Sequence, residues 1–89
     1  MKGIITVIGK DSVGIIAKIC TYLAEKNMNI LDISQTIISG YFNMMMIVDA
    51  SENLNKFENT VEELKKLGKE IGVDIRLQSE EIFNSMHRI

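Results

Sequence analysis

Apolar and polar residues alternate with a changing period along this chain, and each change of period marks a new segment. Gly3–Ile8 is rich in β-branched residues and apolar on both faces, which is typical of a strand in the middle of a sheet. From Val13 the apolar residues follow helical spacing, and we expect that helix to end at Asn27–Asn29, because asparagine tolerates the left-handed conformation there. The main apolar stripe of the helix comprises Val13, Ile16, Ala17, Cys20, Leu23 and Ala24, and a neighbouring face carries Ile15, Ile19 and Tyr22.

The middle of the chain predicts a β-hairpin. Ile30–Ser39 alternates, and we expect a strand whose buried face consists of Leu31, Ile33 and Ile37. Gly40 suits the first central position of a tight type II′ turn, where φ is positive. Phe42–Ala50 then returns antiparallel. Because this segment is apolar on both faces, with methionine at 44, 45 and 46, it is predicted to be a central strand.

The last third of the chain predicts a helix, a strand and a short second helix. Asn55 and Glu58 have the spacing of a capping box, and Gly72 suits the C-cap of the same helix. Val73–Gln78 alternates between apolar and polar residues, which is typical of a strand at a sheet edge. Ser79 can cap a final helix. The stripe of the first of these helices is Leu54, Phe57, Val61, Leu64, Leu67 and Ile71, and the final helix is expected to bury Ile82, Phe83 and Met86.

The predicted order is β-α-β-β-α-β followed by a short C-terminal helix, which corresponds to an α+β, ferredoxin-like sandwich. Right-handed crossovers place the first and third strands in the centre of a four-stranded antiparallel sheet, with both long helices on one face. We expect a single domain over residues 1–89, with the βαββαβ core at 1–79 and the C-terminal helix at 80–89. The long helices leave an apolar sheet face uncovered, which favours a homodimer whose second subunit covers that face together with the C-terminal helix.

Composition narrows the classes of function. The chain has 89 residues with 46% hydrophobic and 25% charged residues, which is ordinary for one globular domain. The net charge is −2, and lysines alternate with glutamates, so we expect neither nucleic acid nor an anionic membrane as a partner. A single cysteine excludes an intramolecular disulfide, and the N-terminus lacks a signal-peptide pattern. Together these features favour the cytoplasm.

The most distinctive stretch is the corner between the first strand and the first helix, Gly9–Gly14. Gly9 would let the strand turn, and Asp11 or Ser12 would cap the helix. Gly14 would leave room for a ligand near the backbone, where helix N–H groups can receive a carboxylate. Spacing by itself favours the plainer interpretation of a capped helix with a packing glycine. The stretch matches neither the dinucleotide fingerprint nor the P-loop.

Several motifs together resemble an ACT domain. They are Gly9–Ile16, Leu23-Ala24, Asn27–Ile30 and Ser39-Gly40 with the apolar return strand, and the tail 80–89 is similar to that of small stand-alone ACT-domain proteins. The resemblance implies a homodimeric module that binds an amino acid at the subunit interface and regulates a target protein. It places the ligand at Gly9, Lys10, Asp11, Ser12, Val13, Gly14, Ile15, Asn29, Ile30 and Leu31. We expect no enzymatic activity and no cofactor.

Other functions on the same fold were weighed against this one. An acylphosphatase needs an arginine in the first loop, whereas the two arginines here are Arg76 and Arg88. An RNA-recognition domain presents stacking aromatic residues on its central strands, which here offer Phe42 alone. A structural module that binds another chain without any small ligand shares most of the sequence features and stays an alternative.

Isolated reactive residues predict no further site. Cys20 lies on an apolar stripe with no base near it in sequence, so a structural thiol is expected. His87 has no second histidine or cysteine at ligand spacing, so no metal site is predicted. Asp32 and Asp49 fall on different strands and do not predict an acid–base pair.

Overall fold

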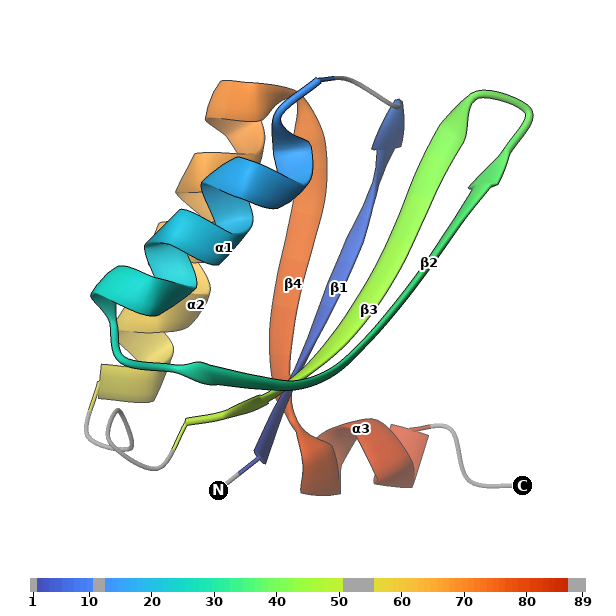
Figure 1. The fold of residues 1–89 in the computed structure, drawn as a ribbon. Coiled ribbons are helices and arrows are strands. Elements are labelled where there is room, and N and C mark those ends of the chain that lie inside the picture. The colour runs from blue at the N-terminus through green and yellow to red at the C-terminus, as the bar shows by residue number, and fades with distance from the viewer. Residues whose placement is uncertain (1, 11–12, 51–55, 87–89) are drawn as a thin grey trace.

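The elements of the fold follow the order that the sequence predicts. The computed structural model describes residues 2–10, 13–50 and 56–86. Its strands form one antiparallel sheet in the order β2-β3-β1-β4, with β1 and β3 in the centre, and α1 and α2 pack on one face (Figure 1). The ferredoxin-like prediction is therefore confirmed. The elements are β1 (Lys2–Lys10), α1 (Ile15–Glu25), β2 (Asn29–Ile38), β3 (Tyr41–Asp49), α2 (Phe57–Ile71), β4 (Val73–Ser79) and α3 (Glu80–Met86).

The hydrophobic core lies between the sheet and the two long helices. Alternate residues of β3 point into it, because successive side chains of a strand face opposite ways. Met46 and Val48 of this strand are fully buried, as are Ile5 and Val7 of β1. Leu64 of α2 closes the core from the helix side and is likewise fully buried.

The buried face of α1 differs from the predicted main stripe. Ile15, Ile19 and Leu23 are buried, whereas Ala17 is exposed and Val13, ahead of the helix, is fully exposed. Residues four apart lie along one helix face, and the buried face combines Ile15 and Ile19 of the predicted neighbouring face with Leu23 of the predicted main stripe. Ile16 and Cys20 of the main stripe are half-buried and pack against the core, so the prediction is correct in part. The helix also begins at Ile15, two residues after the predicted start at Val13.

Left-handed residues end both long helices and form the hairpin turn. Asn27 has φ 56° after α1 and Gly72 has φ 81° after α2, as predicted. Ile38 pairs with Tyr41, so Ser39 and Gly40 are the two central residues of the turn. Their φ values of 51° and 82° are both positive, which makes the turn type I′. The predicted type II′ is wrong, because Gly40 takes the second central position instead of the first.

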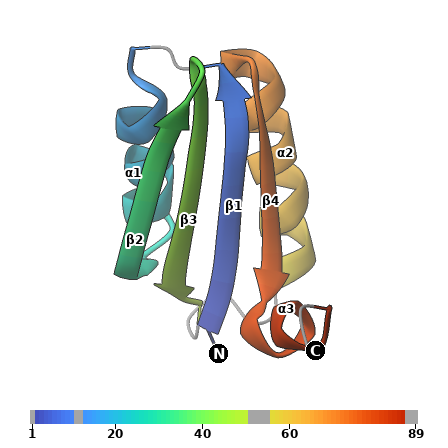
Figure 2. The same cartoon turned by 90° about the vertical axis from the view of Figure 1, so that its right-hand side faces the viewer.

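The opposite face of the sheet stays largely open. Figure 2 shows this face, with α3 lying across the end near the N-terminus and contacting β1 and β4. Ile4, near that end, is buried, but Ile8 and Met45 are 47% and 41% exposed. Ile82 is itself 56% exposed, so the prediction that α3 buries it is wrong. Within the described helices, none combines the length and apolar character that a membrane crossing requires.

The last two helices begin differently, because a side-chain cap is seen for α3 and not among the described residues for α2. The backbone N–H of Ile82 donates to Ser79 Oγ at 3.2 Å, which is the cap predicted for α3. At the start of α2 the cap position is Lys56, without a side-chain cap hydrogen bond. The predicted capping residue Asn55 and the first stripe residue Leu54 lie outside the described residues, as do Asp11, Ser12 and His87.

Candidate functional site

The predicted ligand corner joins the end of β1 to the start of α1. Lys10 ends the strand and is exposed, Val13 is fully exposed, and Ile15 is buried in the core as the first residue of the helix. The part of the corner that the structure describes therefore exposes one charged and one apolar side chain, while its last residue anchors the helix in the core. Asp11 and Ser12, the predicted caps, lie outside the described residues.

Gly9 has a different role from the predicted one. It is paired with Phe42 of β3 and Val73 of β4, so the strand continues through it to Lys10 instead of turning there. A Cβ atom at Gly9 would stand 2.6 Å from Val73 Cγ1 and 3.0 Å from Val73 Cα. The glycine is needed because β1 and β4 approach closely at this point.

Gly14 is the residue that turns the chain into α1. Its φ of 90° is a left-handed value that favours glycine, and a Cβ atom there would meet nothing within 4 Å. The carbonyl of Gly14 accepts the Lys18 N–H at 3.0 Å, which closes the first turn of the helix. Among the described residues nothing therefore crowds the side of Gly14 where a side chain would stand, and the N–H groups of the first helical turn are ones that an anionic group can bind.

The second predicted part of the site lies at the far end of α1. Asn29, Ile30 and Leu31 begin β2, and Figure 1 shows this segment beside the C-terminal end of the helix. An 11-residue helix is about 16 Å long, so one copy of the chain does not bring the corner and this segment together. A hollow of about 500 Å³ does open beside Asn29 and Ile30. Its wall includes Cys20, which is half-buried, and Leu23, which is buried.

β2 has no buried face, which corrects the sequence prediction. All ten of its residues are exposed, including Ile33 at 44% and Ile37 at 59%. Ile33 and Ile37 pair with Met46 and Phe42 and so share the helix side of the sheet. They stay exposed because β2 curves away from α1 toward its C-terminal end (Figure 1). Leu31 lies at a register shift between Ile30 and Asp32 and is also exposed. We call the three exposed apolar residues Leu31, Ile33 and Ile37 the β2 stripe.

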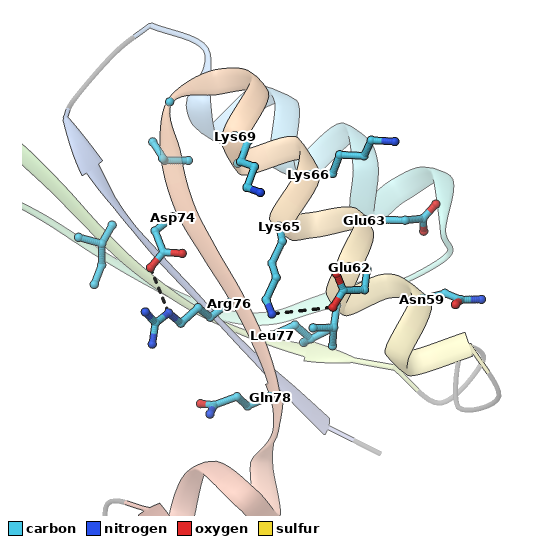
Figure 3. Close-up of a pocket in the computed structure, with 15 residues that line it drawn as sticks. Asn59, Glu62, Glu63, Lys65, Lys66, Lys69, Asp74, Arg76, Leu77 and Gln78 are labelled. Atoms are coloured by element: carbon cyan, nitrogen blue, oxygen red, sulfur yellow. Dashed lines mark hydrogen bonds and ion pairs between the residues drawn. The ribbon is translucent and has the colours of Figure 1, made fainter.

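The outer edge of β4 adjoins a hollow of about 1140 Å³, which sequence reasoning missed. One wall is the flank of α2 that carries Lys65 and Lys69, and the other is β4 itself (Figure 3). We call this hollow the β4 groove. Two features of the sequence indicate it. The lysines are spaced four apart on one helix face, and the next segment alternates like an edge strand.

A polar cluster joins α1 to α2 on the outer surface. The Tyr22 hydroxyl donates to Glu63 Oε1 at 2.7 Å, and Lys26 Nζ lies 3.5 Å from the same oxygen. The hydrogen bond from Tyr22, assisted by Lys26, holds the pKa of Glu63 below its ordinary value. Burial, and then the hydrogen bond to Glu63, raise the pKa of Tyr22. No group of metal-binding side chains occurs among the described residues.

Comparisons with known proteins agree with this architecture. The family model of the ACT domain matches residues 3–78. A UPF0237 protein of Bifidobacterium longum is 62% identical over 88 residues, which cover 99% of this chain and 98% of the relative. An ACT domain protein from Streptococcus pneumoniae has a TM-score of 0.84 at 42% identity, with 98% of each chain covered. The regulatory subunit of aspartate kinase from Thermus thermophilus aligns at a TM-score of 0.68 and 26% identity, covering 89% of this chain and 51% of that one.

The family model spans the four strands and both long helices, and the match to the Streptococcus pneumoniae protein extends over almost the full length of both chains. An ACT domain is in general a regulatory module for small molecules, amino acids among them. The chain belongs to the ACT domain family.

Proposed function

We propose that this chain is a non-catalytic regulatory module, which binds an amino acid as a homodimer and signals to a partner protein. The observation that carries the proposal is the β2 stripe. An edge strand with ten exposed residues, several of them large and apolar, is a surface that pairs readily with another strand. A second copy of the same strand is a self-complementary partner for it.

Antiparallel pairing of two β2 strands would also assemble the divided site. In each copy β2 begins beside Asn29 and ends beside the hairpin turn, at the end of the sheet where Lys10 pairs with Tyr41. Antiparallel pairing would set the start of one β2 against the end of the other. The corner of one copy would then face the Asn29–Leu31 segment of its partner. The hollow beside Asn29 would provide room for the ligand between them.

Charge and backbone geometry support an amino acid as the ligand. The start of α1 offers helix N–H groups to a carboxylate, and Gly14 leaves the approach to them open. The carboxylate of Asp11 would supply a negative charge for the ammonium group of the ligand. The regulatory subunit of aspartate kinase, to which this chain is similar, gives a precedent for a regulatory role of the fold.

Two measurements test the dimer and the ligand together. Sedimentation equilibrium should show a dimer, and thermal-shift assays with the twenty amino acids should show stabilisation by one or a few of them. Ile33→Lys should yield a monomer that no longer responds, because it places a charge on the β2 stripe. Thr21→Lys adds the same charge at an exposed position of α1 and should leave both properties intact.

Mixing two defective variants tests whether the site spans two copies. Gly14→Val damages the corner and Asn29→Ala damages the other segment. In a refolded equal mixture, about one quarter of the sites would combine two intact halves. Calorimetry should recover binding at that level. A dimer that responds to no amino acid would refute the ligand, and recovery of no sites in the mixture would refute the shared site.

A further inference from the structure

The β4 groove follows the free edge of the sheet. Among the strands that the structure describes, β4 pairs only with β1, so every second residue directs its N–H and C=O groups outward into the groove. Figure 3 shows Asp74 and Arg76 on one side of β4 and Leu77 on the side of α2. Side chains from both faces of the sheet therefore line the groove, which is the space that one more strand would occupy.

The charges of the groove are unbalanced once its internal pairs are counted. Asp74 is paired with Arg76 at 3.0 Å, whereas Lys65 Nζ lies 3.8 Å from Glu62 Oε1 in a surface contact whose side chains are 54% and 76% exposed. Such an exposed contact is weak, so Lys65 is able to pair with an acid of a bound segment instead. Glu63, the remaining acid in the lining, is bound by Tyr22 and Lys26 of α1. Lys66 and Lys69 form no ion pair with any residue that the structure describes. The groove thus carries uncompensated positive charge, although the whole chain has a net charge of −2.

The spacing of the lysines suits an extended segment. Lys65 and Lys69 lie one helical turn apart, which corresponds to about 6 Å along α2. Side chains on one face of a strand repeat at about 6.6 Å. Since α2 runs alongside β4 (Figure 2), acidic residues at alternate positions of an added strand would meet both lysines.

We propose that the free edge of β4 binds an extended, acidic segment of a partner protein as an added β-strand. The main chain of the segment would complete the hydrogen bonds of β4, and its acidic side chains would face Lys65 and Lys69. Small polar side chains on the other face would lie beside Arg76. This inference rests on the proposed function in assuming a regulated partner protein, and it names the surface that contacts that partner.

The test uses a peptide of four Glu-Thr repeats as the probe, with four Lys-Thr repeats as its charge-reversed control. NMR titration of the whole chain should show amide shifts concentrated in 61–69 and 73–79 for the acidic peptide alone. Binding should weaken as salt is added, because the contacts with the lysines are exposed. N-methylation of alternate peptide residues should abolish binding in one of the two possible frames and be tolerated in the other, since an added strand uses every second N–H.

Variants of the chain distinguish binding in the groove from nonspecific attraction of the peptide to positive charge elsewhere on the surface. Lys65→Ala with Lys69→Ala should reduce the affinity roughly 2- to 30-fold, the range expected for two exposed ion pairs. Lys2→Ala with Lys18→Ala removes the same charge from exposed positions of β1 and α1 and should have little effect. Equal binding of both peptides, shifts outside the groove, or no binding at millimolar peptide would overturn the proposal. The charges would then serve to keep the β4 edge from pairing. Dimerisation and the amino acid response are measured separately, so this failure would leave the proposed function standing.

Discussion

Gly68 sets how closely α2 lies on β4, and replacing it by alanine measures that contact. A Cβ atom at this position would stand 2.5 Å from the Val73 carbonyl oxygen and 3.2 Å from Ile75 Cγ1. The nearest atom belongs to the backbone, so rotation of a side chain cannot relieve the clash. Reaching even 3.0 Å requires that α2 move outward by about 0.5 Å, away from a close-packed core.

Two opposing effects decide the free energy of unfolding of Gly68→Ala. Overpacking of a well-packed site costs about 1–3 kcal/mol. Alanine in place of glycine inside a helix returns about 1 kcal/mol. We therefore expect a net loss of about 1 kcal/mol, because the clash involves backbone that the sheet holds on its other side. A loss of this size is a sizeable fraction of the stability of a small domain.

Urea denaturation followed by circular dichroism, at one fixed protomer concentration, measures this change. The pair Lys66→Ala and Lys66→Gly calibrates the helix term, since Lys66 is exposed in the same helix. Subtracting that calibrated gain from the Gly68→Ala result gives the cost of the clash alone. If Gly68→Ala were more stable than the unmodified chain by the full calibrated helix gain, the clash would cost nothing and the close seating of α2 on β4 would be refuted.

Three further predictions concern the turn, the helix–helix contact and the core. Ser39→Asn should raise the free energy of unfolding by about 0.5 kcal/mol in urea melts, because Asn-Gly is the preferred pair of a type I′ turn. Tyr22→Phe should lower the free energy of unfolding most at neutral pH. Urea melts of both proteins at a series of pH values test whether the difference shrinks at acidic and alkaline pH. The lowered pKa of Glu63 gives stability that is lost as pH falls below its ordinary 4.5, and the raised pKa of Tyr22 gives stability that is lost above 10. Leu64→Ala, at a fully buried position, should cost about 2–5 kcal/mol and be visible as a loss of cooperative thermal unfolding.

Composition over short segments was sufficient to predict the sheet. Gly3–Ile8 and Phe42–Ala50 are apolar on both faces, and both form central strands. The left-handed ends of the helices could also be predicted, because Asn27 and Gly72 tolerate a conformation that other residues avoid. These predictions depend on local backbone preference and side-chain alternation, both of which are encoded within a few residues.

Features that depend on how elements sit in space could not be predicted in the same way. The alternation of Ile30–Ser39 predicts one apolar face, but that face is buried only if another element covers it. Here β2 curves away from α1, so the face stays exposed. The buried face of α1 could be predicted only in part, because periodicity gives two adjacent faces nearly equal apolar content. Of the candidate site, the sequence indicated the glycine at Gly14 and the position of Asn29 at the opposite end of the helix, but it could not show how a second copy of the chain would bring the two parts together.

The two edges of the sheet are suited to different partners for a physical reason. The β2 stripe is apolar, and apolar pairing between identical strands brings no like charges together. The β4 edge carries Asp74 and Arg76 on one face and lies beside lysines on the other, so it favours a strand of opposite charge over a second copy of itself. A dimer joined at β2 would extend the sheet and leave a β4 edge free at each end. Within each copy α1 would then connect the two surfaces, since it follows directly on Gly14 and contacts α2 through Tyr22 and Glu63 beside the groove. A ligand that repositions α1 would therefore act on the wall of the β4 groove, and the partner would affect ligand affinity by the same factor.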